Sequence, residues 1–574
     1  MKKYLFIAIA ALGFAACAEK LDDNNAPHGG EMEESYIAIN LLSADVDTRA
    51  ATDSYGYEEG TDAERAVNTA YFFFFDENGN PFNVTGAPAT APGGAKNHLT
   101  LAITDASSDM PNVSDIKNAV LVLSTYKGIY PSQIVAVLNW VPDANTAYSL
   151  TELHAALENI GNDTNGYVMS NSVYMDGLGK MIDAVPLTAA NIKTTSEEAL
   201  GSPLDIYVER TAAKVVLTAS GKVTGTDNIF DTQKETTPVV TLGTPSTIDV
   251  YVKLHGWELF NDYDNSSLLK NINTSWEIGT LGLTWNDIPY YRCYWADSQT
   301  TPLTDTFAWS YSDADKTSKG FQTNYGFKVG ASADYTDRTT YTYCGENTNQ
   351  VDGTTDPRTK VILKGQLMQK NGENYEPLEL ARWYGTEYAG NEDLRTAVAN
   401  SLKYTLFYHD VANSKYVSIA PDDLVCVEGD VVGAHAYEVG FQLSNTGDDK
   451  IWYQYNSTSG YQVLGSLTPE ENKTAANTYL KGVEPGILYT NGMTYYHVDI
   501  EHLGTAGAKY GVVRNHVYQI DIESIKGYGS PFYSSLDFIV DVPDYPYEDD
   551  GSYVAARINV LSWKVVKQGV DIEQ

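Results

Sequence analysis

The sequence predicts an all-β protein made of two tandem antiparallel β-sandwich domains, with long loops and few short helices. The chain has 42 tyrosines, and valine and threonine are also plentiful, which favours strands with one buried and one solvated face. Its 46 glycines and 21 prolines supply many turns. With 574 residues the chain exceeds the size of one ordinary domain, so at least two folding units are expected.

The excess of acidic residues argues against nucleic acid and other acidic molecules as binding partners. The net charge is −37, from 75 acidic and 38 basic residues. A basic surface for nucleic acid is therefore not expected, and acidic partners are disfavoured. We interpret the acidity as a feature that keeps the protein soluble at high local concentration.

The N-terminus is typical of an exported bacterial lipoprotein. "MKK" is followed by the apolar stretch "YLFIAIAALGF" and by "AAC", which ends at Cys17. The apolar run is shorter than the roughly 18 residues that a membrane span needs. Residues 1–16 are therefore predicted to be a signal peptide, and Cys17 is predicted to be the lipidated residue.

A short strand and an accessible arginine follow. Residues 18–34 are polar and suit a tether, and Ile37, Ile39 and Leu41 then alternate with smaller or polar residues, as in a strand with one apolar face. Arg49 lies in the polar stretch "DVDTRAATDS", where a trypsin-like protease could reach it.

The first half of the chain continues with strands and one helix. "AYFFFF" ends at a hairpin signal, Asn78-Gly79, and "QIVAVLNW" is a further strand. In "SLTELHAALENIG", Ser149 and Glu152 predict a capping box at the start of a helix, with apolar residues at helical spacing through Ile160. "PLDIYVERTAAKVVLTAS" is strand-like, and the loose sequence after it predicts a domain boundary near residue 218.

The second half repeats this style. It contains several further strand-like segments, long polar loops between residues 261 and 350, and a possible second helix in "DLRTAVANSLKYTLF". No simple internal repeat is visible.

No residue pattern indicates catalysis, a cofactor or a metal. His497 and His502 are five residues apart, which on a strand places them on opposite faces and argues against a shared metal. No phosphate-binding loop, dinucleotide fingerprint or serine-nucleophile elbow occurs. Carboxylates are abundant, but spacing cannot identify a glycosidase pair, since such pairs form in three dimensions. Cys293, Cys344 and Cys426 show no disulfide or metal spacing and are expected to be small buried residues.

The chain ends on an apolar strand with no obvious partner. After the acidic segment "DVPDYPYEDDGSY" comes "ARINVLSWKVVKQGVDIEQ", and nothing follows it. An unpartnered apolar strand is an aggregation hazard. Its alternation changes phase at Val560–Leu561 and again near Val566, which predicts bulges or bends at those points. Gly569 is an alternative position for the second break.

Seven segments of the sequence, taken in their order along the chain, are more specific than its composition and strand patterns. They are "YVMSNSVYMDG" (167–177), "IYVERTAAKVVL" (206–217), "GWELF" (256–260), "RCYWAD" (292–297), "YTYCGENT" (341–348), "GVVRNHVYQIDIESIKGYGSP" (511–531) and "INVLSWKVV" (558–566). Together they closely resemble the fimbrial major-subunit family of the Bacteroidales, the fimbrillins of type V pili. Each string is weak by itself, but the ordered set covers nearly the whole chain.

The resemblance implies a pathway of export and polymerisation. The precursor is exported as a lipoprotein through Cys17, and an arginine-specific surface protease cuts after Arg49, which leaves Ala50 as the new N-terminus. The cut removes a strand matched by residues 36–42, which had covered a hydrophobic groove. A C-terminal strand from a neighbouring subunit then fills this groove. The fold implied is two tandem transthyretin-like sandwiches.

These implications assign regions of the chain. Residues 17–49 are the propeptide with its masking strand, residues 50–218 the N-terminal domain, and residues 219–574 the C-terminal domain, which ends in the donor strand 557–572. The donor strand offers the apolar residues Ile558, Val560, Leu561, Trp563, Val565, Val566, Val570 and Ile572.

The leading hypothesis is a stalk pilin without catalytic activity or cofactor, which supports adhesion and biofilm formation. Its expected partners are copies of itself, anchor and tip pilins, the protease, and surface ligands on host or bacterial cells. The outer membrane is contacted only through the precursor's lipid, before the protein enters the extracellular fimbria. The alternatives are a tip adhesin of the same pilus, a surface glycan-binding lipoprotein and, with least support, a secreted hydrolase.

Overall fold

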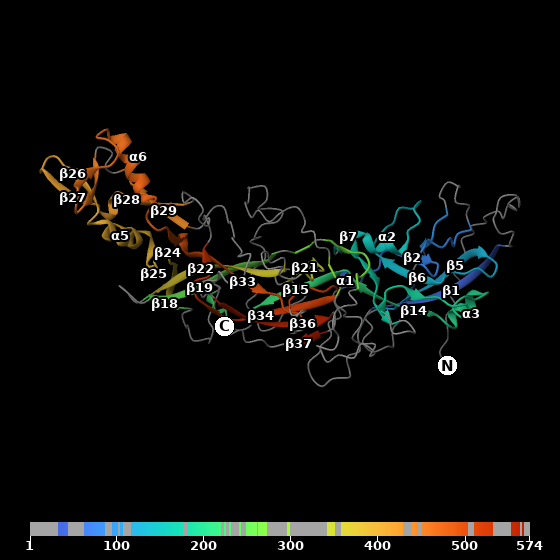
Figure 1. Cartoon of the computed structure of the whole chain (residues 1–574). Coiled ribbons are helices and arrows are strands. Elements are labelled where there is room, and N and C mark those ends of the chain that lie inside the picture. Colours follow the sequence, from blue (N-terminus) through green and yellow to red (C-terminus); the bar gives the residue numbers. More distant parts are fainter. Residues whose placement is uncertain are drawn as a thin grey trace.

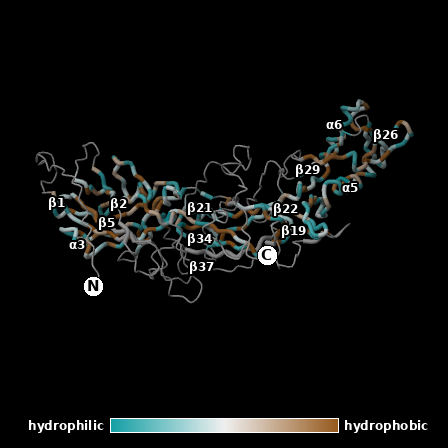
Figure 2. Tube along the Cα trace, turned by 180° about the vertical axis from the view of Figure 1, so that it is seen from behind, coloured by the Kyte–Doolittle hydropathy of each residue, from teal (hydrophilic) through white to brown (hydrophobic). Residues whose placement is uncertain are grey.

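A computed structural model of the chain shows an elongated molecule of three units that follow one another (Figure 1), and each unit has a main hydrophobic core. The structure describes residues 32–43, 62–86, 95–100, 104–106, 116–162, 164–175, 181–219, 223–224, 229–230, 240–242, 248–260, 262–263, 265–272, 296–298, 341–349, 358–428, 438–445, 450–502, 510–531, 553–562 and 565–567. The described part is dominated by strands, which confirms the predicted all-β class. In Figure 2 the hydrophobic stretches lie along the strands of both sandwiches.

The N-terminal sandwich is one continuous nine-stranded sheet curled around its core. Its main order is β3-β2-β6-β10-β14-β1-β5-β4. These strands are β1 (Met32–Ser43), β2 (Ala70–Phe75), β3 (His98–Thr100), β4 (Thr104–Ala106), β5 (Ile116–Tyr126), β6 (Gln133–Leu138), β10 (Met169–Asn171) and β14 (Leu204–Arg210), and β13 (Val185–Pro186) pairs with β6. Phe72 and Phe74 of β2 and Ile206 of β14 meet in this core.

Both faces of strand β2 are buried, because its even-numbered and odd-numbered phenylalanines pack into two different clusters. Phe73 and Phe75 of β2 point into a second cluster with Val135 and Val137 of β6. Both faces of β2 are buried, so "YFFFF" reads as a continuous apolar run rather than as an alternating strand. The turn after β2 contains Gly79 at φ +79°, as the Asn78-Gly79 pair predicts.

The second sandwich packs two sheets around the largest core. One sheet has the order β21-β15-β34-β36-β37, and the other has the main order β16-β17-β19-β22-β33-β35, with β18 and β23 at its side. The first sheet comprises β15 (Ala212–Thr218), β21 (Tyr341–Gly345), β34 (His516–Lys526), β36 (Tyr553–Ser562) and β37 (Val565–Lys567). The second comprises β16 (Val223–Thr224), β17 (Ile229–Phe230), β18 (Val240–Leu242), β19 (Ile248–Phe260), β22 (Lys360–Asn371), β23 (Asn374–Pro377), β33 (Met493–Asp499) and β35 (Ser530–Pro531).

A third unit, which the sequence analysis did not predict, is inserted between β23 and β33. It has its own core, two sheets and two helices, and it lies at the end of the molecule opposite β1 (Figure 1). One sheet has the order β25-β24-β32-β29-β28, from β24 (Leu380–Trp383), β25 (Thr386–Tyr388), β28 (Leu424–Glu428), β29 (Glu438–Leu443) and β32 (Gly486–Tyr489). The other has the order β27-β26-β30-β31, from β26 (Leu406–Asp410), β27 (Lys415–Ser418), β30 (Trp452–Asn456) and β31 (Gly460–Val463).

The helices correct the sequence analysis in two places. The helix α2 (Leu150–Ala155) has the predicted Ser149–Glu152 capping box, but it ends early, because β7 (Leu157–Asn159) forms a strand with β20 (Asn265–Ser267). The helix α5 (Gly390–Leu402) confirms the second predicted helix. The helix α6 (Pro469–Leu480) was missed, although Thr468, Pro469 and two glutamates form a recognisable helix start.

No helix in the described part of the chain is both long enough and apolar enough to span a bilayer.

Candidate assembly site: strand β1, the C-terminal strand and the domain junction

Strand β1 occupies an inner position in the N-terminal sheet. It pairs antiparallel with β5, from Met32 opposite Tyr126 to Leu42 opposite Ile116, and parallel with β14, from Ile39 opposite Leu204 to Ser43 opposite Val208. Both backbone edges of β1 are therefore hydrogen-bonded over its C-terminal half. The strand closes the sheet between two neighbours that do not pair with each other.

The apolar side chains of β1 belong to the domain core. Ile37 and Ile39 are 0% exposed and pack in the cluster that contains Phe72 and Phe74. The backbone of Leu41 lies in the same strand at the same parity, and its side chain lies outside the described residues. Complete burial of the two isoleucines stabilises β1 by roughly 1.5–3 kcal/mol each.

Polar contacts fix the start of β1. Glu33 accepts hydrogen bonds from the Tyr130 hydroxyl at 2.6 Å and from the Gly128 amide at 3.2 Å. The Tyr130 hydrogen bond lowers the pKa of the Glu33 carboxyl, and the Gly128 amide adds to this effect. Tyr36 exchanges two backbone hydrogen bonds with Lys193, on the connection that precedes β14.

A sheet without β1 has a defined vacancy. β5 and β14 then present unpaired N–H and C=O groups along facing edges, and the core behind Ile37 and Ile39 loses its cover. Such a slot favours one ligand above others, an extended segment with alternating apolar side chains. The predicted processing residues Cys17, Arg49 and Ala50 lie outside the described residues.

The C-terminal strand lies in the second sandwich. β36 pairs antiparallel with β34, and the chain then reverses so that β37 pairs antiparallel with β36. The bulge predicted at Val560–Leu561 is wrong: these residues pair in unbroken register with Tyr518 and Val517. The register shifts instead within β34, between Ile522 and Ser524. The phase change in the sequence is better explained by the reversal after Ser562, because β37 begins a new strand.

Of the eight apolar residues predicted for the donor strand, five are described by their backbone and not by their side chains: Ile558, Val560, Leu561, Val565 and Val566. The other three, Trp563, Val570 and Ile572, lie outside the described residues.

The chain passes from the first sandwich to the second at a single residue. Arg210 ends β14, Ala212 begins β15, and Thr211 between them donates from its amide to the Val168 carbonyl of the first sandwich. The change of sheet lies N-terminal to the boundary expected near residue 218. One residue therefore separates the last strand of the first sandwich from the first strand of the second.

A buried ion pair crosses this connection. The Lys214 ammonium of β15 lies 2.9 Å from the Glu64 carboxylate of α1 (Asp62–Arg65), and both side chains are fully buried. Tyr343 of β21 donates from its hydroxyl to the same carboxylate. Burial, with the adjacent Glu64 charge, raises the pKa of Tyr343 far above its usual range.

A segment of the second sandwich reaches back into the first. After β19, residues 265–267 form β20, which pairs with β7 of the first sandwich, and Leu268 and Leu269 are 0% exposed in its second cluster. Ser170 of β10 donates a hydrogen bond of 2.5 Å to the Leu268 carbonyl. We call residues 265–270 the clasp, because they join the two sandwiches independently of the covalent connection.

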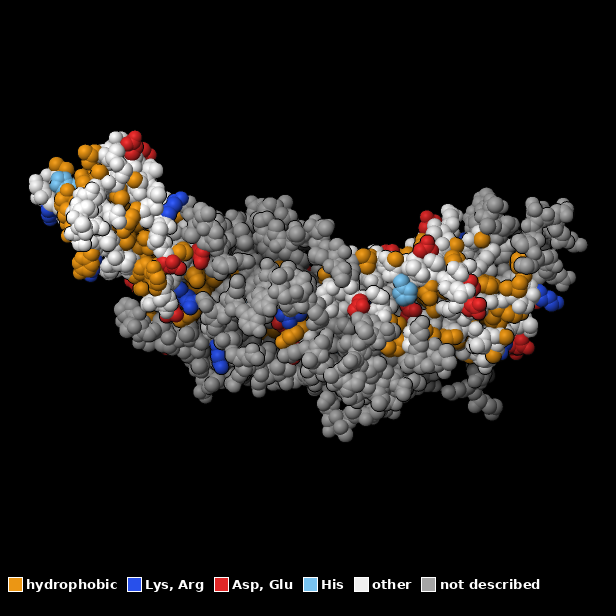
Figure 3. All heavy atoms as spheres, viewed as in Figure 1, with side chains coloured by type: hydrophobic (Ala, Val, Ile, Leu, Met, Phe, Trp, Pro, Cys, Tyr) orange, Lys and Arg blue, Asp and Glu red, His pale blue; other side chains and the backbone are white. Residues whose placement is uncertain are grey.

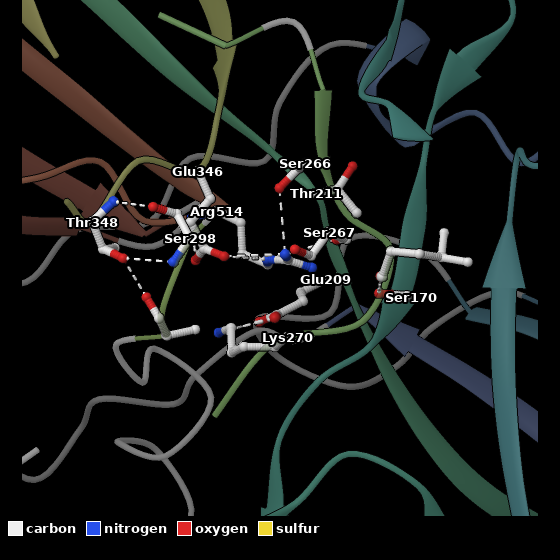
Figure 4. Close-up of polar contacts among 12 residues, drawn as sticks. Ser170, Glu209, Thr211, Ser266, Ser267, Lys270, Ser298, Glu346, Thr348 and Arg514 are labelled. Carbon is white, nitrogen blue, oxygen red and sulfur yellow. Dashed lines mark hydrogen bonds and ion pairs between the residues drawn. The ribbon is translucent and has the colours of Figure 1, made fainter. Parts of the chain in front are cut away.

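The clasp ends in a network of buried charges (Figure 4). Lys270 lies 2.9 Å from Glu209 of β14, and both side chains are fully buried. Arg514 lies 3.0 Å from Glu346 and also donates to the Ser266 hydroxyl and the Ser267 carbonyl of the clasp. Burial raises the pKa of the Glu209 carboxyl, against the opposing effects of Lys270 and Arg514.

Sequence reasoning missed this junction, although a signal was present. "IYVERTAAKVVL" places Glu209, Arg210 and Lys214 inside an apolar run, and charges are rarely buried unless they are paired. Their partners, Lys270 and Glu64, are distant in sequence, so pairing could not be inferred from spacing.

Cys344, Cys426 and His502 lie in the described part of the chain. Cys344 is buried in the core of the second sandwich, and Cys426 is half-buried. Burial raises the pKa of both thiols, and that of Cys426 rises to about 12. His502 lies beyond the end of β33 and contacts the Tyr518 hydroxyl at 3.0 Å. No group of three potential metal-binding side chains is found among the described residues. Cys293 lies outside them.

Comparison with known proteins identifies one region of the chain. Residues 487–569 match the family model described as "Major fimbrial subunit protein type IV, Fimbrillin, C-terminal". This region contains β33, β34, β36 and β37 in full. No curated protein matches.

Several solved structures are similar over most of the chain at low identity. A proposed cell-adhesion protein of Parabacteroides distasonis is 13% identical over 92% of this chain and 99% of that chain, with a TM-score of 0.32. One of Bacteroides eggerthii is 10% identical over 96% and 100%, with a TM-score of 0.32. A fimbrial assembly protein of Parabacteroides distasonis is 9% identical over 75% and 100%, with a TM-score of 0.26. At TM-scores below 0.5 these similarities support no inference about individual residues.

The resemblance drawn from the ordered strings is thus confirmed where the family model applies, since residues 487–569 match the C-terminal region of fimbrillin, the major fimbrial subunit protein.

Proposed function

We propose that the chain is a structural subunit, a pilin, of a cell-surface fimbria. It is exported as a lipoprotein through Cys17, activated by cleavage between Arg49 and Ala50, and polymerised when the C-terminal strand of one subunit enters the next. The filament supports adhesion and biofilm formation and has no catalytic role. The precursor belongs to the outer membrane, and the processed subunit belongs to the extracellular fimbria, together with anchor and tip pilins.

The observation that carries this proposal is the inner position of β1. The strand precedes Arg49 in sequence, and it fills the gap between β5 and β14 with two fully buried isoleucines. A cut after Arg49 converts this strand from a covalently held part of the sheet into a separate peptide. A longer strand can then replace it, because the peptide is no longer held at high effective concentration.

The C-terminal segment has the chemistry to act as the replacement. Burying about five of its apolar residues contributes roughly 7–15 kcal/mol before ordering costs are subtracted. Strand addition also satisfies the exposed backbone edges of β5 and β14. A head-to-tail contact of this kind does not close on itself, so it generates a filament.

The pairing of β36 with β34 adds a condition to the proposal. Within one subunit the C-terminal segment is already paired, with β37 folded back as the edge of the sheet. Insertion into a neighbour therefore requires at least β37 and the residues after it to leave this hairpin. Loss of the three-residue β37 costs less than loss of β36, because β37 pairs on one side only.

The decisive experiment starts from the purified precursor and trypsin. The proposal expects cleavage after Arg49, a ladder of SDS-resistant oligomers and fibres in electron micrographs. An Arg49→Gln precursor is the matched control and should stay monomeric. Stable monomers after complete cleavage at Arg49 would show that the chain is not a polymerising pilin.

A truncation separates the donor role from a folding role. Removal of residues 568–574 leaves β36 and β37 intact and should weaken the ladder, whereas removal of residues 563–574 also deletes β37 and should abolish it. Both products should keep the circular dichroism of a folded subunit. Unimpaired polymerisation of the shorter chain would rule out the C-terminal segment as donor.

A further inference from the structure

The inserted third unit presents one sheet face that its own core does not use. In the sheet β27-β26-β30-β31, Leu406, Tyr408 and Trp452 point toward the core of the unit. The opposite face carries six aromatic side chains, which register assigns to one side: Phe407, His409, Tyr416, Tyr453, Tyr455 and Tyr461. We call these six residues the aromatic face.

The rings of the aromatic face are held in place by one another. Tyr416 and Tyr461, from the two edge strands, stack with ring centroids 3.7 Å apart and an interplanar angle of 4°. Tyr416 also meets Tyr453 edge-on at 5.1 Å, and Tyr461 meets Phe407 edge-on at 5.1 Å. These contacts fix the side-chain rotamers before any ligand binds, which lowers the entropy cost of binding.

The face is nevertheless open to solvent. Tyr416, Tyr455 and Tyr461 are 37–38% exposed. The hydroxyl groups of Tyr416, Tyr453, Tyr455 and Tyr461 form no hydrogen bond with any residue that the structure describes. Figure 3 shows hydrophobic side chains gathered at the end of the molecule that carries β26 and β27. An exposed cluster of rings with free hydroxyls is a typical recognition surface.

The charge of the face selects among ligands. The two remaining outward positions are Ser418 and Val463, so none of the eight carries a carboxylate, an ammonium or a guanidinium group. The chain as a whole has 75 acidic and 38 basic residues. This neutral face complements a neutral ligand and offers no counter-charge to a sulfated, phosphorylated or strongly acidic one.

The size of the face argues against a protein partner. The four strands are each four or five residues long. With strands about 4.8 Å apart and about 3.3 Å per residue, the sheet covers roughly 250–320 Å². A stable protein interface needs about 800 Å² from each partner, so the face is too small for a second copy of the chain. It is large enough for a short oligosaccharide.

We propose that the aromatic face binds a neutral carbohydrate. The C–H faces of pyranose rings pack on the aromatic rings, and sugar hydroxyls exchange hydrogen bonds with the free tyrosine hydroxyls. Sugars suit the face because each ring presents an apolar side and polar edges, as the tyrosines do. The unit lies at the end of the molecule opposite β1, so ligand binding and strand insertion use different parts of the subunit (Figure 1).

Native affinity electrophoresis of the full Arg49→Gln precursor tests this proposal without requiring polymerisation. The gels contain mannan, mixed-linkage β-glucan or xylan as neutral polymers, and heparin as a charged polymer. The proposal expects retardation by at least one neutral polymer and none by heparin. Tyr416→Ser and Tyr461→Ser should each weaken retardation by about tenfold or more, since each removes half of the stacked pair.

Tyr404→Ser is the matched control, because Tyr404 is a 72%-exposed tyrosine of the same unit outside the aromatic face, and it should change nothing. Tyr461→Phe keeps the ring and should retain most of the binding. If a serine variant loses its thermal unfolding transition, Tyr455→Ser replaces it, because Tyr455 lies at the side of the stack. Mobility unaffected by every neutral polymer, equal retardation of all variants, or a Tyr461-dependent dimer in sedimentation would each overturn the proposal.

Discussion

Lys270 and Glu209 form an ion pair of 2.9 Å, with both side chains fully buried, between the clasp of the second sandwich and the last core strand of the first. A second buried pair, Glu64–Lys214, crosses the same junction at 2.9 Å. Leu268 and Leu269 of the clasp also pack into the first sandwich, and β20 pairs with β7. Ion pairs, apolar packing and strand pairing therefore all join the two sandwiches. These contacts hold the two sandwiches together in addition to the covalent connection at Thr211.

The first prediction concerns this ion pair. Lys270→Met should lower the free energy of unfolding by about 3–5 kcal/mol, because the Glu209 carboxylate then lies buried without its partner. The double variant Lys270→Met with Glu209→Leu should recover most of the loss, since no uncompensated charge remains. Urea unfolding followed by tryptophan fluorescence measures both. A loss under about 1 kcal/mol for the single variant would mean that water reaches the site.

The half-buried pair Arg382–Glu387, at 3.8 Å and with side chains 19% and 33% exposed, is more accessible to solvent and provides the control. Arg382→Met should change the free energy of unfolding by less than about 1 kcal/mol.

The second prediction separates packing from charge in the clasp. Leu268→Ala should cost about 2–5 kcal/mol, because it leaves a cavity in the second cluster of the first sandwich. Leu467→Ala is the matched control, because Leu467 is 68% exposed, and it should be close to neutral. If the two variants have the same midpoint of thermal unfolding, Leu268 does not contribute to stability in solution.

Gly345 provides a second test of the contact between the clasp and the second sandwich. A Cβ on Gly345 of β21 would lie 2.1 Å from the carbonyl oxygen of Asn265 in the clasp. Gly345→Ala should therefore displace the clasp and increase amide hydrogen exchange in residues 265–267, whereas Gly372→Ala, in open space but at positive φ, should affect only its own turn.

The third prediction concerns how firmly β1 is held. Ile37→Ser should weaken the strand by removing a fully buried apolar side chain, and Glu34→Ser on the exposed face should not. If β1 masks an assembly groove, the Ile37→Ser precursor should form SDS-resistant oligomers without protease. The corresponding Glu34→Ser precursor should remain monomeric. A monomeric Ile37→Ser precursor that polymerises normally after cleavage would show that this side chain does not control release.

The fourth prediction follows from a buried histidine in the first sandwich. His98 is packed among Phe73, Tyr71 and Tyr148, and burial lowers its pKa to about 4, with a smaller effect from Lys96. The folded-state pKa lies below the unfolded value of about 6.5, so between pH 6.5 and pH 4 the unfolded chain binds a proton that the folded protein does not. The free energy of unfolding is therefore highest, with respect to this residue, above pH 6.5 and decreases as the pH falls toward 4. Between these pH values the wild type should lose roughly 2–3 kcal/mol of its free energy of unfolding through this residue.

His98→Phe keeps an aromatic ring in the same pocket and removes the titration. Its free energy of unfolding should therefore fall less than that of the wild type between pH 6.5 and pH 4. Parallel pH profiles for the two proteins would contradict the assignment.

The sequence allowed prediction of those features that depend on local patterns. The strand class, the Asn78-Gly79 turn, the Ser149–Glu152 capping box and helix α5 all follow from residues close together in the chain. The length of helix α2 was wrong because β7 pairs with β20, more than a hundred residues away, and such pairing overrides local helical spacing. The bulge at Val560–Leu561 was wrong because alternation alone cannot distinguish a bulge from a chain reversal.

The candidate site was only partly accessible to the same reasoning. Alternation marked Ile37 and Ile39 as one face of a strand, but the inner position of β1 depends on which strands flank it. The third unit escaped prediction because its strands are short and its helices lie between them. The aromatic face has no periodic signature in the sequence, since its six residues come from four separate strands.

The fifth prediction tests whether that third unit folds on its own core. Asn472 of α6 is fully buried, and its side chain accepts from the Trp452 amide at 2.6 Å and donates to the carbonyls of Trp452 and Leu464 at 3.0 and 2.6 Å. Asn472→Ala leaves these backbone groups without the side chain that satisfies them, so it should cost about 2–4 kcal/mol.

Hydrogen exchange followed by mass spectrometry shows where this cost appears. Protection should fall in β30, β31 and α6, and it should remain unchanged in β2, β6, β19 and β22, because among the described residues the cluster around Trp452 shares no member with the cores of the two sandwiches. Asn413→Ala, in an exposed turn of the same unit, should leave all regions unchanged. A loss of protection that spread equally into β19 and β22 would mean that the insertion and the second sandwich unfold as one cooperative unit, and that the aromatic face cannot be altered without affecting the sheet that holds the C-terminal strand.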